Sequence, residues 1–184
     1  VTMDWGTVIF AISCVFLAAI VRGFSGFGFS LLTITSLSLV LPTVIVVPAI
    51  FMLEIAASVH MLPGVWREIH WRSLTPLLIG CFVGTPLGVW LLGNAPQAQM
   101  KLALGIFVIT CVTLLWRGFA LKTMPGTAAS ATAGAASGLA NGAFGIGGPP
   151  VILFYFASPA GAAAGRASLI AYFMATDIMG LGFL

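Results

Sequence analysis

Two glycine motifs interrupt apolar stretches of the chain, and both read G-x-x-G-x-G, where x is any residue. Their glycines are Gly23, Gly26 and Gly28 in the first copy, and Gly142, Gly145, Gly147 and the adjoining Gly148 in the second. Glycine costs about 1 kcal/mol in a helix interior, so each motif predicts a broken helix. The helix that begins after such a break offers unpaired N–H groups and a partial positive charge. The motifs therefore predict an anion site at two helix N-termini; alternatively, the glycines only let helices pack closely.

Polar side chains accompany both motifs. Arg22 precedes the first copy, and Asn141 holds the equivalent place before the second. An arginine binds oxyanions with forked donors, although an arginine at a membrane interface can instead reach towards water. The amide of Asn141 could donate to an oxyanion as well. Ser25 and Ser30 add hydroxyl donors, but serine in membrane helices often bonds its own backbone.

Two carboxyl groups, Glu54 and Asp177, lie within apolar segments. Intramembrane carboxylates are costly and are usually functional. A proton-binding role would suit coupling to a proton gradient, and the alternative is a salt bridge or a helix hydrogen bond. Arg166 follows a Ser-Pro-Ala-Gly turn. It either marks the cytoplasmic side or contacts the substrate or a gate.

The composition is that of an integral membrane protein. Of 184 residues, 60% are hydrophobic and only 6% are charged, against about 25% charged in soluble domains. Most of the seven basic residues fall in short loops, which favours orientation signals over nucleic-acid binding. The three cysteines fit no metal motif, and neither a hydrolase motif nor a P-loop is present. We expect no enzyme activity, no cofactor and no metal.

The apolar segments predict helices separated by turns. Their predicted ranges are 5–21, which we expect to be retained as a membrane span, then 27–41, 43–62, 73–92 and 100–116. The second range is short for a crossing, which needs about 20 residues. The fourth contains Gly80, Gly84 and Gly88 at four-residue spacing, which predicts close contact with another helix.

Basic loops give the orientation. The loops 63–72 and 117–126 contain Arg67 and Arg72, and Arg117 and Lys122, respectively. Two predicted spans separate them, so both should lie on one side, which the positive-inside rule makes cytoplasmic. The two glycine motifs are then entered from opposite faces, which is the arrangement of an inverted-topology repeat.

A second match supports the repeat, because residues 49–52 (AIFM) resemble residues 171–174 (AYFM). We therefore predict an all-α helical bundle of two inverted repeats with Gly/Pro-broken helices. Residues 1–116 hold the first repeat and adjoining spans, 117–126 form a cytoplasmic basic loop, and 127–184 form the second repeat. Because the chain ends inside an apolar segment, we expect the second repeat to be incomplete.

These residues resemble the TauE/SafE sulfite-exporter-like permeases over nearly the whole chain. The resemblance rests on a glycine motif followed by proline in each half (Pro42; Pro149 and Pro150), the WREIHWR loop at 66–72, and the segments PLLIG at 76–80 and GTPLG at 84–88. The first copy departs from the pattern, since Phe27-Gly28-Phe29 stands where consecutive glycines are usual. The resemblance implies two similar halves of about four spans each in the bacterial inner membrane, and transport of sulfite, sulfonates, sulfoacetate or other small organic anions.

The leading functional hypothesis is a secondary transporter that binds its anion near the midplane, where the broken segments meet, and works by alternating access. The expected partners are a small anionic substrate, the lipid bilayer and possible coupling protons, and the sequence carries no signal for an oligomeric state. A passive anion channel built from inverted half-helices is the alternative. Counterflow and saturation would distinguish a carrier from a channel.

Overall fold

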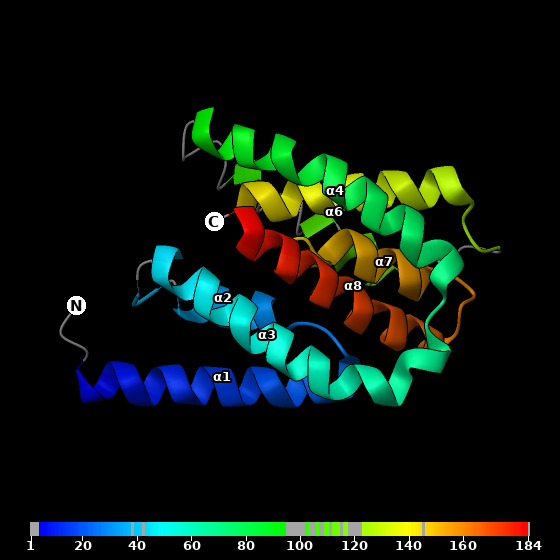
Figure 1. Ribbon diagram of the computed structural model, residues 1–184. Helices are drawn as coiled ribbons and strands as arrows, with labels where there is room; N and C mark the ends of the chain where they lie inside the picture. Colours follow the sequence, from blue (N-terminus) through cyan, green and yellow to red (C-terminus); the bar gives the residue numbers. More distant parts are fainter. Residues whose placement is uncertain are drawn as a thin grey trace.

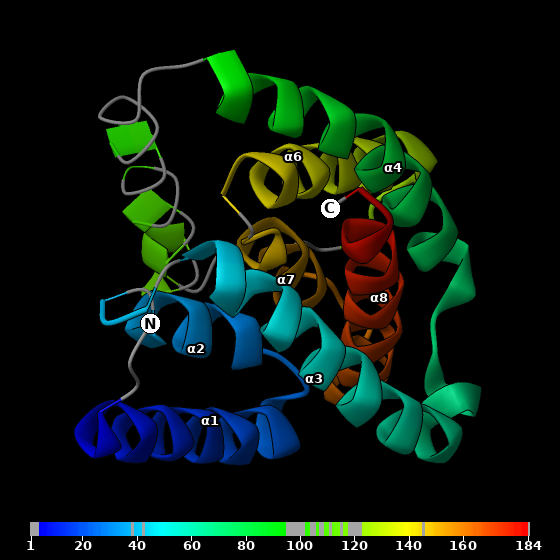
Figure 2. The ribbon, with the colours of Figure 1, turned by 60° about the vertical axis from the view of Figure 1, so that its left-hand side comes forward.

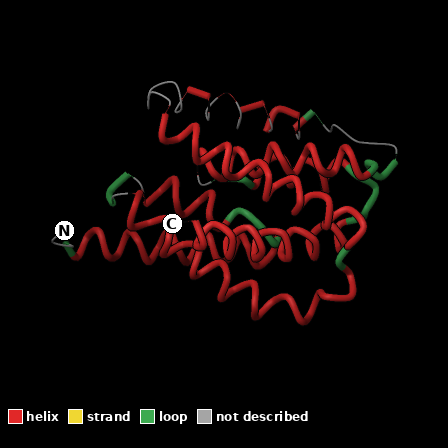
Figure 3. Tube along the Cα trace, turned by 45° about the horizontal axis from the view of Figure 1, so that its top comes forward, coloured by secondary structure: helices red, strands yellow, loops and turns green. Residues whose placement is uncertain are grey.

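The computed structural model describes residues 4–37, 39–41, 43–94, 102–103, 106, 109–110, 112–114, 116–117, 123–144 and 146–183. Within these ranges all regular structure is helical (Figure 3), which confirms the predicted all-α class. The predicted turn at 93–99 and span at 100–116 lie largely outside the described residues, as do Pro42, Lys122 and Gly145.

The helices form two groups with the same order of long, short and long. The first group is α1 (Trp5–Ser25), α2 (Phe29–Leu37) and α3 (Thr43–Val65); the second is α6 (Thr127–Phe144), α7 (Gly148–Ala157) and α8 (Ala162–Phe183). Between the groups come the single turn η1 (Trp66–Glu68) and α4 (Trp71–Asn94). The short segment predicted after the first motif is confirmed as α2, which has nine residues.

One boundary differs from the prediction. The helix predicted to end at residue 21 continues as α1 through Gly23 to Ser25, and Gly142 likewise lies inside α6. A single glycine costs only about 1 kcal/mol in a helix, which the surrounding backbone hydrogen bonds can offset. Only the later glycines of each motif therefore stand at a helix break.

The two groups run in opposite directions (Figure 1). The beginning of α1 and the end of α8 lie at the same end of the bundle, at the left of the view. α1 and α3 run away from that end, whereas α6 and α8 run towards it. The described parts of both basic loops, residues 66–70 and 123–126, lie together at the other end. This placement agrees with the prediction that the loops share one side.

Small residues bring α4 and α6 into direct backbone contact, and the two helices lie side by side in Figure 2. A Cβ atom added at Gly80, Gly84 or Gly88 would come within 3.0 Å of backbone atoms of α6. The same holds in the other direction for Gly134, Gly138 and Gly142 against α4. The close contact predicted for the three α4 glycines is confirmed, and each has a counterpart on α6.

Among the described residues, three helical segments are long and apolar enough to cross a membrane: Trp5–Ser25, Pro48–Glu68 and Trp71–Leu91. Only 11% of the apolar window of the first is buried, so most of α1 is available to lipid. The larger buried core joins α4, α7 and α8 through residues such as Leu77, Val151 and Leu169. A smaller core joins α1, α2 and α3. The start of α2, at Phe29, thus belongs to the smaller core, and α7 belongs to the larger one.

Candidate functional site

The first break lies between α1 and α2. Gly26 and Gly28 have φ angles of 80° and 90°, a region that side chains with a Cβ atom disfavour. The N–H of Gly26 closes α1 by donating to the carbonyl of Arg22 at 2.7 Å. The first hydrogen bond of α2 runs from the N–H of Leu32 to the carbonyl of Gly28, at 3.0 Å. The preceding N–H groups of the first turn therefore have no acceptor within the helix.

The second break precedes α7, which begins at Gly148 with Gly147 as its N-cap. Pro149 and Pro150 occupy the next two positions, as expected for prolines in a first turn. Proline has no N–H group, so only Gly147 and Gly148 can donate from this end. α2 therefore presents the fuller set of unpaired N–H groups.

A hydrogen-bonded pair holds the second break against α6. The hydroxyl of Ser137 donates to the carbonyl of Gly147, and the hydroxyl of Tyr172 donates to Ser137 Oγ at 2.8 Å. A Cβ atom at Gly147 would lie 2.8 Å from Cβ of Asn141, so this glycine permits the close approach. Neither Ser137 nor Tyr172 was predicted from the sequence. Ser137 stands four residues before Asn141 on the same helix face, and that spacing could have identified it.

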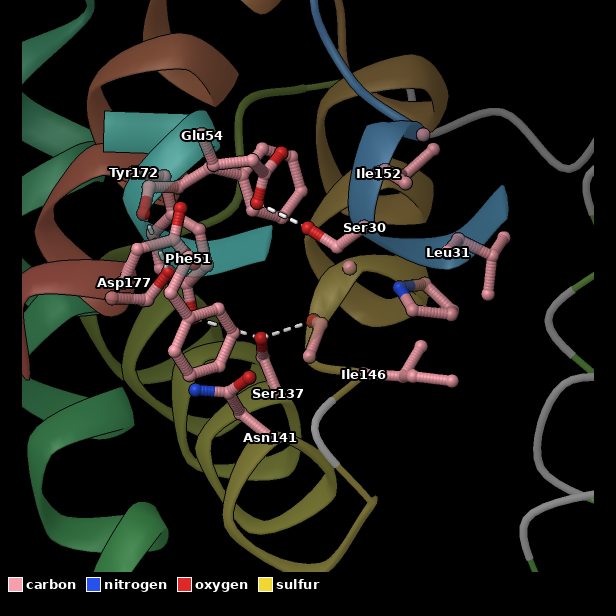
Figure 4. Close-up of a pocket in the computed structure, with 16 residues that line it drawn as sticks. Ser30, Leu31, Phe51, Glu54, Ser137, Asn141, Ile146, Ile152, Tyr172 and Asp177 are labelled. Carbon is pink, nitrogen blue, oxygen red and sulfur yellow. Dashed lines mark hydrogen bonds between the residues drawn. The ribbon is translucent and has the colours of Figure 1, made fainter. Parts of the chain in front are cut away.

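Both half-helix N-termini line one cavity (Figure 4). Its walls include Gly28, Ser30 and Leu31 from the start of α2, Gly147, Gly148 and Pro149 from the start of α7, Ser137 and Asn141 from α6, Phe51 and Glu54 from α3, and Tyr172, Phe173, Thr176 and Asp177 from α8. The cavity has a volume of about 30 Å³. That volume has room for about one or two water molecules.

Seven of the predicted site residues therefore meet at this cavity, although they come from distant parts of the chain: Gly28, Ser30, Glu54, Asn141, Gly147, Gly148 and Asp177. Six others do not line it: Arg22, Gly23, Ser25, Gly26, Gly142 and Arg166. Gly145 lies outside the described residues.

Arg22 is buried between α1 and α3, with an exposed fraction of 2%. Its guanidinium forms an ion pair with the carboxylate of Glu54 and donates to Ser58 Oγ at 2.5 Å. A further donor lies 3.4 Å from the carbonyl oxygen of Glu54. This burial contradicts an interfacial arginine that reaches towards water. The ion pair engages part of the guanidinium, whose Nε atom has no hydrogen-bond partner among the described residues.

The two carboxyl groups have different surroundings. Glu54 accepts hydrogen bonds from Arg22 and from the hydroxyl of Ser30, so the salt bridge considered for it is present. Asp177 is also buried, yet its Oδ2 atom has no hydrogen-bond partner among the described residues. The negative charge of Glu54 acts on the neighbouring carboxyl group of Asp177. In the described part of the chain, no cluster of three acidic, histidine or cysteine side chains could hold a metal ion.

The remaining predicted residues make structural contacts. Ser25 donates to the carbonyl of Val21 at 2.8 Å, as serine in a membrane helix often does. Arg166 donates to the carbonyl of Gly23 at 2.7 Å and so joins the start of α8 to the end of α1. A cation near a helix C-terminus is favourable because the helix dipole is negative there. Gly26 makes room for this arginine, since a Cβ atom there would lie 2.7 Å from Arg166 Cγ.

Comparison with known proteins confirms the resemblance found in the sequence. The sulfite exporter TauE/SafE family matches residues 11–184. A probable sulfite/organosulfonate exporter TauE of Cupriavidus necator is 29% identical over 167 residues, which cover 85% of this chain and 62% of that protein. The chain therefore spans less than two thirds of the length of this relative. No solved structure matches the chain. Because the family match extends over nearly every residue, the chain belongs to the TauE/SafE family of sulfite exporters.

Proposed function

We propose that this chain carries the substrate site of a secondary active transporter for small sulfur-containing or organic anions, such as sulfite, sulfonates or sulfoacetate. The observation that carries the proposal is the meeting of two half-helix N-termini at one buried cavity. N–H groups at such ends attract anions, and a buried setting strengthens that attraction. The sulfur chemistry comes from the family and from the exporter of Cupriavidus necator.

The arrangement of the helices supports alternating access. Each group has a long, a short and a long helix, and the groups run in opposite directions (Figure 1). We propose that residues 1–116 and 127–184 contain inverted repeats joined through the cytoplasmic loop 117–126, in a multi-pass protein of the bacterial inner membrane. In transporters of this kind, one repeat moves against the other around a central site.

The cavity volume supports a carrier over an open channel. A conducting pore needs a continuous path for its ion, whereas this cavity has room for about one or two water molecules. An organosulfonate is larger than that, so its binding requires the walls formed by α2, α3, α7 and α8 to separate. Alternating access supplies such a movement, and we propose that proton coupling at the carboxyl pair of Glu54 and Asp177 accompanies it.

The binding site can be tested by adding one negative charge to the cavity. Sulfite, methanesulfonate, taurine and acetate are screened by thermal shift on the purified protein, with Asn141→Asp and the matched control Asn94→Asp. Asn141 lines the cavity, whereas Asn94 is exposed near the end of α4. We expect a sulfur anion to raise the unfolding temperature of the control, and Asn141→Asp to lose this stabilisation because the new carboxylate repels the anion. Equal shifts in both variants, or none for any anion, would contradict the placement.

Transport in proteoliposomes then separates carrier from channel. A carrier loaded inside with unlabelled substrate takes up labelled substrate faster, because the returning site is occupied. We expect such counterflow, with a rate that saturates as the anion concentration rises. A rate that stays proportional to concentration, with no counterflow, would show a channel.

A further inference from the structure

The cavity contains more carboxyl groups than cations. Glu54 and Asp177 both line it, while the guanidinium of Arg22 is engaged by Glu54. Asp177 is 3% exposed, and its Oδ2 atom has no partner among the described residues. With both carboxyl groups ionised, these three side chains carry a net charge of −1. A substrate anion would then be repelled from the N-termini that should bind it.

Among the described residues, the lining of the cavity around Asp177 includes no cation. α3 contributes Glu54 and the exposed His60, and α1 contributes Arg22, which is paired with Glu54. α8 itself contributes Tyr172, whose hydroxyl is bonded to Ser137, and Arg166, which donates to the carbonyl of Gly23. α4 contributes Cys81 and the exposed Arg72, and α7 contributes Tyr155. The sequence of α6 contains no titratable side chain, and the charged residues of η1 are exposed in the loop.

We propose that Asp177 takes up a proton when the anion binds, so that proton and anion cross the membrane together as symported partners. This inference rests on the proposed function and specifies its coupling. The proton enters from water and adds to a carboxylate oxygen of Asp177, which makes the side chain neutral. The anion can then occupy the space between the half-helix N-termini. Glu54 is already engaged by Arg22 and by the hydroxyl of Ser30, so the proton is assigned to Asp177.

The sign of the coupling follows from the charges. In an antiporter, proton and substrate exclude one another from the site. Here the titrating group has the same sign of charge as the substrate, so protonation removes a repulsion and raises the affinity for the anion. By linkage, anion binding must raise the affinity for the proton by the same factor. Release of either partner on the other side then favours release of its companion.

The test measures protons and anion together. Methanesulfonate serves as the probe because its sulfonate group stays ionised and does not titrate in the range used. It is added to the purified protein in weak buffer with a pH-sensitive dye, and binding is measured in parallel by calorimetry. We expect about one proton to be taken up for each anion bound. Over the range in which Asp177 titrates, affinity should fall by up to about tenfold for each unit of rising pH.

Asp177→Asn provides a neutral side chain of similar shape. We expect it to bind methanesulfonate without proton uptake and with an affinity that is independent of pH. Asp4→Asn is the matched control, since Asp4 is exposed just before α1 and its side chain makes no capping bond. The control should take up a proton as the unaltered protein does. If Asp177→Asn fails to fold, proton uptake by the unaltered protein still decides the sign of the coupling.

Several outcomes would overturn the inference. Anion binding without proton uptake, binding with proton release, or unchanged uptake in Asp177→Asn would each refute it while leaving anion transport intact. An affinity that depends on sodium and not on pH would assign the cavity to a metal cation. If no anion bound at any pH, the proposed function itself would fail, and this inference with it.

Discussion

The buried ion pair of Arg22 and Glu54 allows a quantitative test of the packing between α1 and α3. Both side chains are 2% exposed, so solvent screens their interaction weakly. Removing one member of such a pair typically costs about 3–5 kcal/mol, because the other charge stays buried without compensation. Replacing both by apolar residues of similar volume is often neutral or stabilising.

Four proteins are compared: the unaltered chain, Arg22→Met, Glu54→Met and the double variant. Arg22→Met leaves Glu54 ionised beside Asp177 with only the Ser30 hydroxyl as a donor, so we expect a loss of about 3–5 kcal/mol. Glu54→Met leaves Arg22 with Ser58 and a backbone carbonyl, and we expect a loss at the lower end of that range. The double variant should unfold within about 1 kcal/mol of the unaltered protein.

The free energy of unfolding is measured in mixed lipid–detergent micelles by titration with a denaturing detergent, followed by tryptophan fluorescence. Arg67→Met is the control, because Arg67 is exposed in η1 and its removal should change stability by no more than about 0.5 kcal/mol. If the losses of the single variants simply add in the double variant, the two residues do not interact as described. That result would refute the buried pair and the charge count of the cavity built on it.

Two further predictions concern glycines, and Gly23→Ala is the control for both. This control should be neutral or slightly stabilising, because no atom lies within 4 Å of a Cβ atom placed at Gly23. Gly84→Ala should destabilise the protein by about 1–3 kcal/mol, because its Cβ atom would collide with backbone atoms of α6. If Gly84→Ala and Gly23→Ala are equally stable in detergent unfolding, the close contact between α4 and α6 is disproved. Gly26→Ala should lower the free energy of unfolding by at least about 1–2 kcal/mol, because a φ of 80° is unfavourable for alanine and the Cβ atom would displace Arg166. Unchanged stability would disprove the left-handed conformation at Gly26.

The predicted elements agree well with the structure where local signals were strong. Lipid provides no hydrogen-bond partners, so apolar segments must form helices, and α1, α3 and α4 lie close to their predicted ranges. The half-helix α2 follows from glycines and from a segment too short to cross. The predicted end of α1 before the first glycine of its motif was wrong, because one glycine is not enough to end a helix whose neighbours continue it.

The candidate site was predictable in part. Gly142 and Gly147 belong to one motif, yet Gly142 packs against α4 and Gly147 faces the cavity. The two glycines have different surroundings because Gly142 still lies inside α6, on the face that packs against α4, whereas Gly147 lies beyond the end of α6. Ser137 and Tyr172 were missed because their hydrogen bonds matter only once α6, α7 and α8 are packed together.

The sequence alone determined a membrane-embedded helical protein, the presence of two helix breaks within its glycine motifs and its family, because hydrophobicity and backbone propensity act over short stretches of chain. Tertiary structure decided the partners of the charges. Arg22 meets Glu54 across 32 positions, and Arg166 meets Gly23 across 143. Such contacts depend on the rotation of each helix about its axis and on the order of packing, which no short stretch encodes. For the same reason, only the folded chain shows that Arg22 is paired with Glu54, and that Asp177 lines the cavity with an Oδ2 atom that has no hydrogen-bond partner among the described residues.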